Sequence, residues 1–219
     1  MFYKPENKNR FFGRGVRYTN IKWSDFGQVV QQFRSRIHEW YLKPGDELQN
    51  ASWDYSFTLM AIDCLLIDTL SQYWSGNKKS SQALFKRYVA EKIPDLAANL
   101  PTPINQPNGA QLTTFADVLY VGFRCGILHE AHVSLFGGLA GLGGKLCDVD
   151  TDICTRYQDN SVCPTVRMDP TAIFSKLKSL FHEYMNELLD PHRSKNQLRS
   201  KFKKKFKQSF GIDLSRFQL

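Results

Sequence analysis

The sequence FTLMAIDCLLIDTL, residues 57–70, is the most apolar stretch of the chain. Helical periodicity extends this stretch to about residues 52–74, with apolar side chains on nearly every side. A helix that is apolar all round is normally the buried centre of a bundle. Asp63 and Asp68 interrupt the apolar run, which is also too short to span a bilayer. The stretch therefore predicts a helical protein packed around this segment, and the two carboxyl groups are expected either to make structural contacts or to face a cleft.

Further helices are predicted on either side of the central one from apolar residues at helical spacing. Three of them cover about residues 24–42, 81–92 and 170–188, and a fourth begins near Thr113 and ends in the glycine-rich residues 137–144. Lys43-Pro44-Gly45-Asp46 is expected to end the first of them, residues 101–111 to form a loop, and the glycine-rich residues 137–144 to form a linker. Residues 145–168 alternate weakly around Asp159-Asn160-Ser161, which predicts a small β-hairpin. The expected fold is an all-α bundle of about five or six helices with this hairpin inserted.

The positive charge of the chain is confined to its C-terminal end. The formal net charge is +8, and residues 193–219 contain nine Lys and Arg against one acid, Asp213. These residues therefore carry +8 alone, while residues 1–192 hold 20 basic and 20 acidic groups, which cancel. A localised basic segment favours a polyanionic partner. We therefore expect two parts, a helical domain over residues 1–192 and a basic appendage over residues 193–219.

The appendage is predicted to be an amphipathic helix, because apolar residues recur every four positions among its lysines: Leu198, Phe202, Phe206 and Phe210. Three interpretations stay open. The helix binds RNA phosphates, lies on an anionic membrane surface, or packs its apolar stripe on the bundle with the lysines in solvent. The first is compatible with the last, and it assigns RNA contacts to Lys201, Lys203, Lys204, Lys205 and Lys207.

Cysteine usage and the N-terminal residues favour the cytoplasm. Five cysteines are an odd number in a chain of 219 residues, and reduced thiols are the simpler interpretation. Residues 1–17 mix basic and aromatic side chains and lack the apolar run of a secretory signal. We expect a cytoplasmic protein with no membrane-spanning segment and no cofactor.

Two patterns resemble metal sites only superficially. Asp148, Asp150 and Asp152 are spaced as in a calcium loop, but its sixth position is Ile153 rather than glycine and its twelfth is Asp159 rather than glutamate. The other pattern comprises three cysteines, whose spacing is not that of paired C-x2-C knuckles: Cys147, Cys154 and Cys163. We expect no metal site.

The sequence YVGFRCGILHE, residues 120–130, contains the candidate chemistry. Arg124 and His129 are five positions apart, which separates them by about 140° around an ideal α-helix. A shared site therefore needs a helix irregularity near Gly126, or two protomers that meet across a symmetry axis. Without such a site, His129 is a core histidine and Arg124 pairs with Asp117 or Glu130.

The sequence RCGILH, residues 124–129, resembles the R-x4-6-H motif of the HEPN superfamily. The motif stands in a late helix after a strongly apolar one, as in a group of bacterial HEPN-like proteins. The likeness covers about residues 25–190 in helix order and is sharp around residues 55–75 and 118–132. One residue departs from the pattern: many active members carry a polar residue directly after the arginine, where this chain has Cys125.

The resemblance implies metal-independent RNA cleavage by a homodimer, leaving a 2′,3′-cyclic phosphate and a 5′-hydroxyl. His129 would act as general base or general acid, a task suited to imidazole. Arg124 would hold the scissile phosphate with its planar fork. Cys125, Glu130 and His132 would have supporting roles. Such enzymes often serve as toxins or antiviral effectors that an inhibitory partner, such as an antitoxin, holds in check.

Two rival functions come from other classes. One is a catalytically inactive HEPN module that binds RNA, a nucleotide or a protein partner, and Cys125 favours it. The other is a membrane-surface adaptor that uses the basic helix, which co-sedimentation with liposomes would detect.

Overall fold

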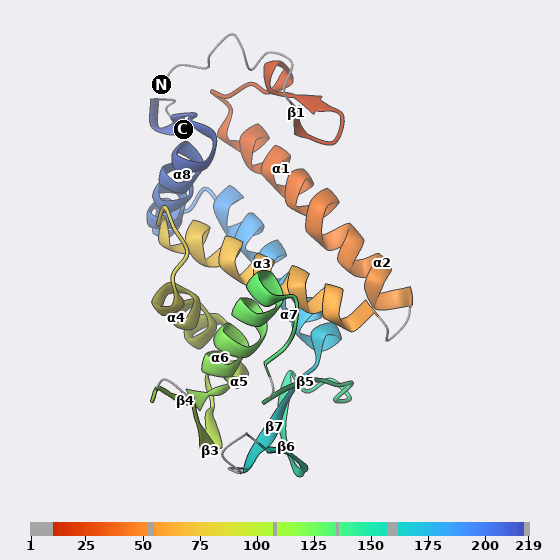
Figure 1. The fold of residues 1–219 in the computed structure, drawn as a ribbon. Helices are drawn as coiled ribbons and strands as arrows, with labels where there is room; N and C mark the ends of the chain where they lie inside the picture. The colour runs from red at the N-terminus through yellow and green to blue at the C-terminus, as the bar shows by residue number, and fades with distance from the viewer. Residues whose placement is uncertain (1–10, 52–54, 107–108, 135, 157–161, 217–219) are drawn as a thin grey trace. The chain divides into compact units, whose positions relative to one another are not determined.

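The computed structural model describes residues 11–51, 55–106, 109–134, 136–156 and 162–216 (Figure 1). The chain divides into two compact units. The first contains Met1–Glu47, Thr69–Ser80 and Lys178–Leu219, and the second contains Leu48–Asp68 and Ser81–Leu177. The predicted appendage therefore belongs to the first unit, and the Arg124 motif belongs to the second. Within the described residues, no helix has both the length and the apolar character needed to cross a membrane.

The first unit begins with β1 (Phe11–Gly13) and β2 (Val16–Arg17), a short antiparallel pair that the sequence analysis did not predict. Helix α1 (Phe26–Ile37) follows, with Asp25 as its N-cap. A single π-helical turn (His38–Leu42) then leads directly into α2 (Lys43–Ala51). The prediction that residues 43–46 end the first helix was wrong. Pro44 directly follows the π turn within this unbroken helical run, where the backbone hydrogen-bond register changes.

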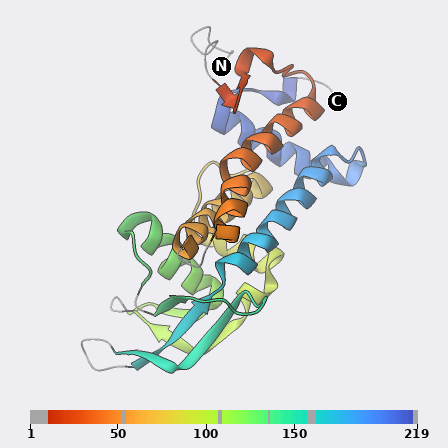
Figure 2. The same ribbon diagram turned by 90° about the vertical axis from the view of Figure 1, so that its right-hand side faces the viewer.

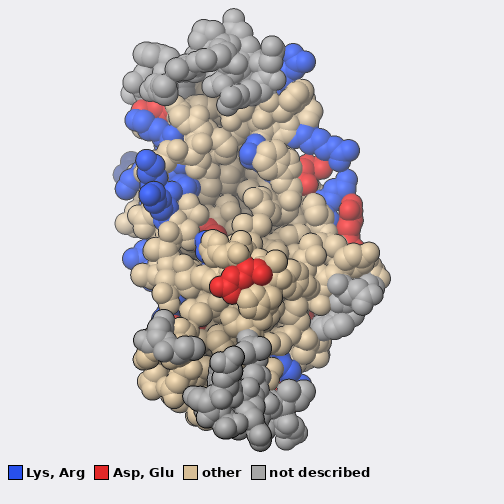
Figure 3. Space-filling view, in the orientation of Figure 1, with Lys and Arg blue, Asp and Glu red and all other residues tan. Residues whose placement is uncertain are grey.

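Helix α8 (Asn196–Phe210) is the predicted amphipathic basic helix. Phe202 and Phe206 are fully buried in the core of the first unit. The ring of Phe202 lies 5.4 Å from that of Phe33 and 5.5 Å from that of Tyr73. The helix ends at Gly211, whose φ of 73° favours glycine. Packing of the apolar stripe is thus confirmed, and Figure 3 shows the blue Lys and Arg side chains gathered over α8.

The second unit is built around the N-terminal part of α3 (Ser56–Ser75), with Met60, Cys64 and Ile67 fully buried. The prediction of a buried central helix is confirmed on most of its circumference, but Phe57 and Leu65 are more than one third exposed. The other helices of this unit are α4 (Gln82–Lys92), α5 (Pro94–Ala97), α6 (Phe115–Val118), a π-helix (Leu119–Glu130) and the start of α7 (Pro170–Leu189).

Two small sheets lie in the second unit (Figure 2). Strands β6 (Cys147–Arg156) and β7 (Val162–Met168) pair antiparallel, as the predicted hairpin requires. Strand β5 (Gly137–Leu139) pairs parallel to β7, so the predicted linker begins with a strand. Strands β3 (Asn99–Asn105) and β4 (Gln111–Thr114) form a hairpin over most of the predicted loop. The protein is therefore mostly helical rather than all-α.

Candidate functional site at Arg124 and His129

Arg124 and His129 lie side by side because the segment that carries them is a π-helix. Residues Leu119–Glu130 follow α6, whose N-terminus is closed by a capping box between Thr114 and Asp117. In a π-helix each residue hydrogen-bonds to the fifth one along, so side chains five apart come close together. Nη1 of Arg124 lies 2.9 Å from Nε2 of His129. The predicted helix irregularity is present, and it extends through the whole motif.

Glycines allow the chain to fold back over this π-helix. The helix ends at Ala131, whose φ of 56° is left-handed, and the amide of His132 then donates to the carbonyl of Gly126 at 3.3 Å. A Cβ atom on Gly126 would lie 2.5 Å from the carbonyl oxygen of His132. A Cβ atom on Gly122 would lie 2.8 Å from the ring of Phe136. The absence of side chains at these two positions therefore lets the returning segment cover the motif helix.

Replacement of Gly126 by alanine is expected to destabilise the fold by about 1–3 kcal/mol, because the new methyl group meets backbone that has little room to move. Urea unfolding followed by circular dichroism measures this change. Gly27→Ala in α1 is the matched control, since its nearest contact is a side-chain oxygen at 3.4 Å and alanine favours helix. Equal unfolding midpoints for the Gly126→Ala variant and the wild type would contradict this account of the close approach.

Asp68 of α3 fixes the guanidinium of Arg124. Its Oδ2 accepts from both Nε and Nη2 of Arg124, each at 3.0 Å, and the Asp68 residue is only 7% exposed. Burial disfavours the charged guanidinium, but the charge and hydrogen bond of Asp68 outweigh burial and raise the pKa of Arg124. The ring of Tyr120 lies 5.5 Å from the guanidinium carbon and packs edge-on against Phe85. Arg124 is thus permanently cationic and held in one orientation.

The contact between Arg124 and His129 also defines the state of the imidazole. A guanidinium can only donate hydrogen bonds, so Nε2 of His129 is the acceptor and the ring proton is on Nδ1. The His129 side chain is exposed, so its ring is open to solvent and to a ligand. The pair therefore presents a fixed cation beside a neutral imidazole nitrogen, the combination that phosphodiester cleavage by general base and electrostatic stabilisation uses.

Of the predicted supporting residues, Glu130 and His132 are not drawn into this contact. Nε2 of His132 lies 3.4 Å from Oε2 of Glu130, and both side chains are more than half exposed. Cys125 is a half-buried free thiol whose side chain hydrogen-bonds to Arg124. The alternative pairing of Arg124 with Asp117 or Glu130 is not observed. Asp117 instead forms an ion pair with Lys86, and this ion pair and hydrogen bonds from Thr113 and Thr114 outweigh burial and lower its pKa.

Asp68 and Tyr120 are members of the site that the motif alone does not identify. The sequence placed Asp68 on the central helix but did not show which side of that helix faces the motif. An acidic residue on a largely apolar helix was the available signal, because a buried carboxylate needs a cationic partner. Arg124 is the partner that the structure supplies.

The aspartates and cysteines whose spacing resembles metal sites are described only in part by the structure. Asp148 and Asp150 both form ion pairs with Arg167 on the neighbouring strand β7, at 3.3 and 2.9 Å. The side chain of Asp152 and those of Cys154 and Cys163 lie outside the described residues. Within the described part of the chain, no three His, Cys, Asp or Glu side chains are grouped as metal ligands.

The five lysines of α8 assigned to RNA do not share one environment. Lys205 is buried and donates to Oε1 of Gln72 at 2.7 Å and to the carbonyl of Lys78 at 3.0 Å, which keeps its ammonium inside the first unit. Burial also lowers its pKa. The other four lie at the surface or are only partly covered: Lys201, Lys203, Lys204 and Lys207.

Comparison with known proteins finds no family model, no curated protein and no solved structure that matches this chain.

Proposed function

We propose that this protein is a metal-independent endoribonuclease of the HEPN type, with HEPN-like packing of its helices, that acts in the cytoplasm as a homodimer. The observation that supports the proposal is the 2.9 Å contact between Arg124 and His129, in which an ion pair with Asp68 fixes the guanidinium. Residues that are about 140° apart on an α-helix come together here through a π-helix, and π-helical segments are frequent at functional sites.

Cleavage would proceed through attack of the ribose 2′-oxygen on the adjacent phosphorus. An incoming phosphate accepts from Nη1 of Arg124, which leaves Nε2 of His129 free to take the proton of the 2′-hydroxyl. The 2′-oxygen then bonds to phosphorus, and the bond to the 5′-oxygen breaks. Arg124 stabilises the extra negative charge on the phosphate oxygens. The products are a 2′,3′-cyclic phosphate and, after the leaving oxygen gains a proton, a 5′-hydroxyl.

The exposed apolar side chains of α3 are proposed to form the homodimer interface. Phe57 and Leu65 are 36% and 37% exposed, and they belong to the same unit as the Arg124 site. Large apolar side chains on one side of a helix are stabilised when a second copy covers them. A two-fold interface would use each residue twice.

Replacement of Leu65 by arginine is therefore expected to convert the dimer to a monomer. Each Leu65 is only 37% exposed before association, so loss of the two leucines weakens the dimer by about 1–2 kcal/mol, and the cost of burying two arginine charges adds to this. Sedimentation equilibrium measures the mass, and RNA cleavage is expected to fall with dimerisation. Ala83→Arg on exposed α4 adds the same charge and is expected to leave the dimer intact. If the Leu65→Arg variant still sediments with the mass of a dimer, this face of α3 is not the interface.

A growth assay tests the proposed function in cells. Expression of the wild type alone is expected to slow growth, as for a toxin or an antiviral effector without its inhibitory partner, and the His129→Ala variant is expected to be harmless. If both forms are equally toxic at equal protein levels, the toxicity does not arise from the Arg124–His129 pair.

The second candidate is a catalytically inactive HEPN module that binds RNA, a nucleotide or a protein partner. Two observations favour it. The charge of Arg124 is already paired with Asp68, and Cys125 follows the arginine where many active HEPN proteins have a polar residue. For this candidate, the wild type is expected to bind its ligand without cleaving RNA and to be harmless on expression.

A further inference from the structure

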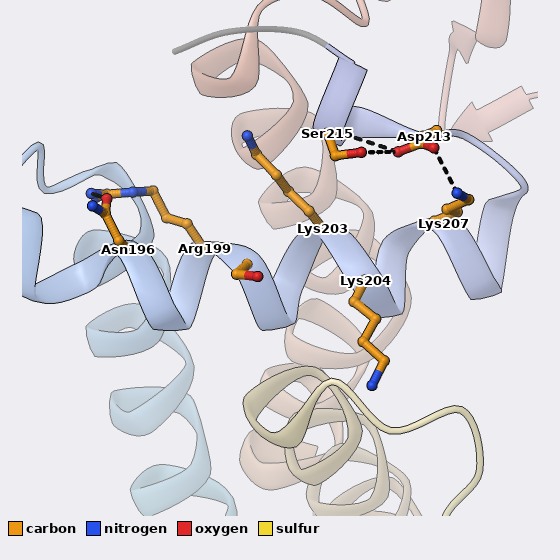
Figure 4. Close-up of a pocket in the computed structure, with 8 residues that line it drawn as sticks. Asn196, Arg199, Lys203, Lys204, Lys207, Asp213 and Ser215 are labelled. Atoms are coloured by element: carbon orange, nitrogen blue, oxygen red, sulfur yellow. Dashed lines mark hydrogen bonds and ion pairs between the residues drawn. The ribbon is translucent and has the colours of Figure 1, made fainter.

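A basic pocket of about 450 Å³ lies along the exposed side of α8, in the first unit (Figure 4). Four cationic side chains of this helix line it, together with Asp213 and Ser215 from the segment after the helix: Arg199, Lys203, Lys204 and Lys207. Arg199, Lys203 and Lys207 are four positions apart, so they follow one another along α8 over about 12 Å. The pocket is therefore an elongated row of cations rather than a single charged point.

One carboxylate occupies this row. Oδ2 of Asp213 accepts from Nζ of Lys207 at 2.6 Å, and its Oδ1 accepts from the amide and hydroxyl of Ser215 at 3.1 and 2.5 Å (Figure 4). The contacts with Lys207 and then Ser215 lower the pKa of Asp213 far below its ordinary value. Asp213 is the only acidic residue of residues 193–219. An anionic group is thus already bound at the Lys207 end of the pocket.

The remaining cations have no such counter-charge. The guanidinium of Arg199 donates to the carbonyls of Asp190 and His192 and to Oδ1 of Asn196, all of which are uncharged groups. Within the part of the chain that the structure describes, Lys203 and Lys204 make no ion pair with a carboxylate. Burial and the neighbouring Arg199 lower the pKa of Lys203. Four cations and one carboxylate leave the pocket with a formal charge of +3.

We propose that this pocket binds consecutive phosphate groups of an RNA strand, and that the Asp213 carboxylate stands in for one of them when RNA is absent. A row of cations in which, among the described residues, only Lys207 pairs with a carboxylate fits a linear polyanion, because a single phosphate cannot reach both ends of the row. The choice of RNA over other polyanions rests on the proposed ribonuclease function. The geometry also limits the predicted contacts: Lys203, Lys204 and Lys207 line the pocket, whereas the ammonium of Lys205 is held inside the unit.

The experiment uses a His129→Ala background, in which RNA is expected to stay intact, and measures binding of a labelled single-stranded RNA at 50 and 200 mM salt by fluorescence anisotropy. Each phosphate contact contributes about −0.7 to the slope of log affinity against log salt. Lys203→Gln/Lys204→Gln is expected to lose two contacts. A fourfold rise in salt should then weaken the parent about sevenfold more than this variant. Lys22→Gln/Lys176→Gln removes the same charge elsewhere and is expected to keep the parental slope.

Asp213→Asn provides the opposite test. Removal of the carboxylate frees Lys207 for a phosphate, so affinity is expected to rise at 50 mM salt and the slope to steepen by about −0.7. Equal slopes for the pocket pair and its control pair would overturn the proposal. So would binding to vesicles of phosphatidylserine and phosphatidylcholine without binding to RNA. This experiment measures binding without cleavage, so it tests the pocket separately from the ribonuclease. If the pocket binds RNA but the wild-type protein never cleaves it, the proposed ribonuclease function is wrong and the proposed RNA-binding pocket stands.

Discussion

Replacement of His129 by alanine is expected to lower the rate of RNA cleavage by about 10²–10⁴-fold, the range that general acid–base groups contribute. The imidazole is the group beside the guanidinium of Arg124 whose ordinary pKa lies near neutrality, which suits it to proton transfer. Because His129 is exposed, its removal leaves the core unchanged. The free energy of unfolding is therefore expected to stay near that of the wild type. Single-turnover cleavage of a labelled RNA measures the rate.

His132→Ala is the matched control for this prediction. His132 is also exposed and lies three residues further along, but it pairs with Glu130 rather than with Arg124. Cleavage by the His132→Ala variant is expected to stay close to the wild-type rate. If the two alanine variants lose activity equally, the 2.9 Å contact does not define the site.

Replacement of Arg124 by alanine is expected to lower cleavage by about 10²–10³-fold and also to destabilise the fold. The first effect is the loss of a preorganised cation beside the phosphate. The second arises because Asp68 is buried and loses the guanidinium that balances its charge, at a cost of about 2–4 kcal/mol. Urea unfolding and single-turnover cleavage separate the two effects. The two members of the motif thus differ, since only the arginine carries part of the stability.

A double-mutant cycle assigns the role of Asp68. Asp68→Asn keeps the shape of the side chain but removes the charge that orients Arg124, so cleavage is expected to fall about tenfold in the wild type. In the Arg124→Ala background the same change should have little effect on cleavage, because there is no guanidinium to orient. Equal losses in both backgrounds would show that Asp68 acts on the reaction without Arg124.

The sequence predicted most of the helices because their signals are local. Ser81, Asp25 and Gly211 stand at the helix ends where capping chemistry places them. The continuation of the chain into α2 was missed because Pro44 and Gly45 are usual helix breakers, and the π turn before Pro44 cannot be foreseen from periodicity. Strand β3 was missed for a similar reason. Its prolines are typical of a loop, although Ile104 in this strand pairs with Leu112 of β4.

The candidate site could be predicted only in part. The motif itself identified Arg124 and His129, but their spacing on an ideal α-helix argued against contact, and a twelve-residue π-helix cannot be foreseen from periodicity. The choice between Asp63 and Asp68 depended on tertiary packing. Asp63 is fully buried, and burial, with a contribution from Asp169, raises its pKa well above the ordinary value. Asp68 meets Arg124 instead, so only the second carboxylate belongs to the site.

The most direct test of the central claim is the cleavage of mixed RNA in EDTA by the wild type and by His129→Ala, followed by analysis of the product ends. Cleavage by the wild type alone is expected, with 2′,3′-cyclic phosphate and 5′-hydroxyl termini. Equal cleavage by both proteins would contradict the assignment of the site. No cleavage by either protein, although both are folded dimers, would contradict the ribonuclease and favour the binding module.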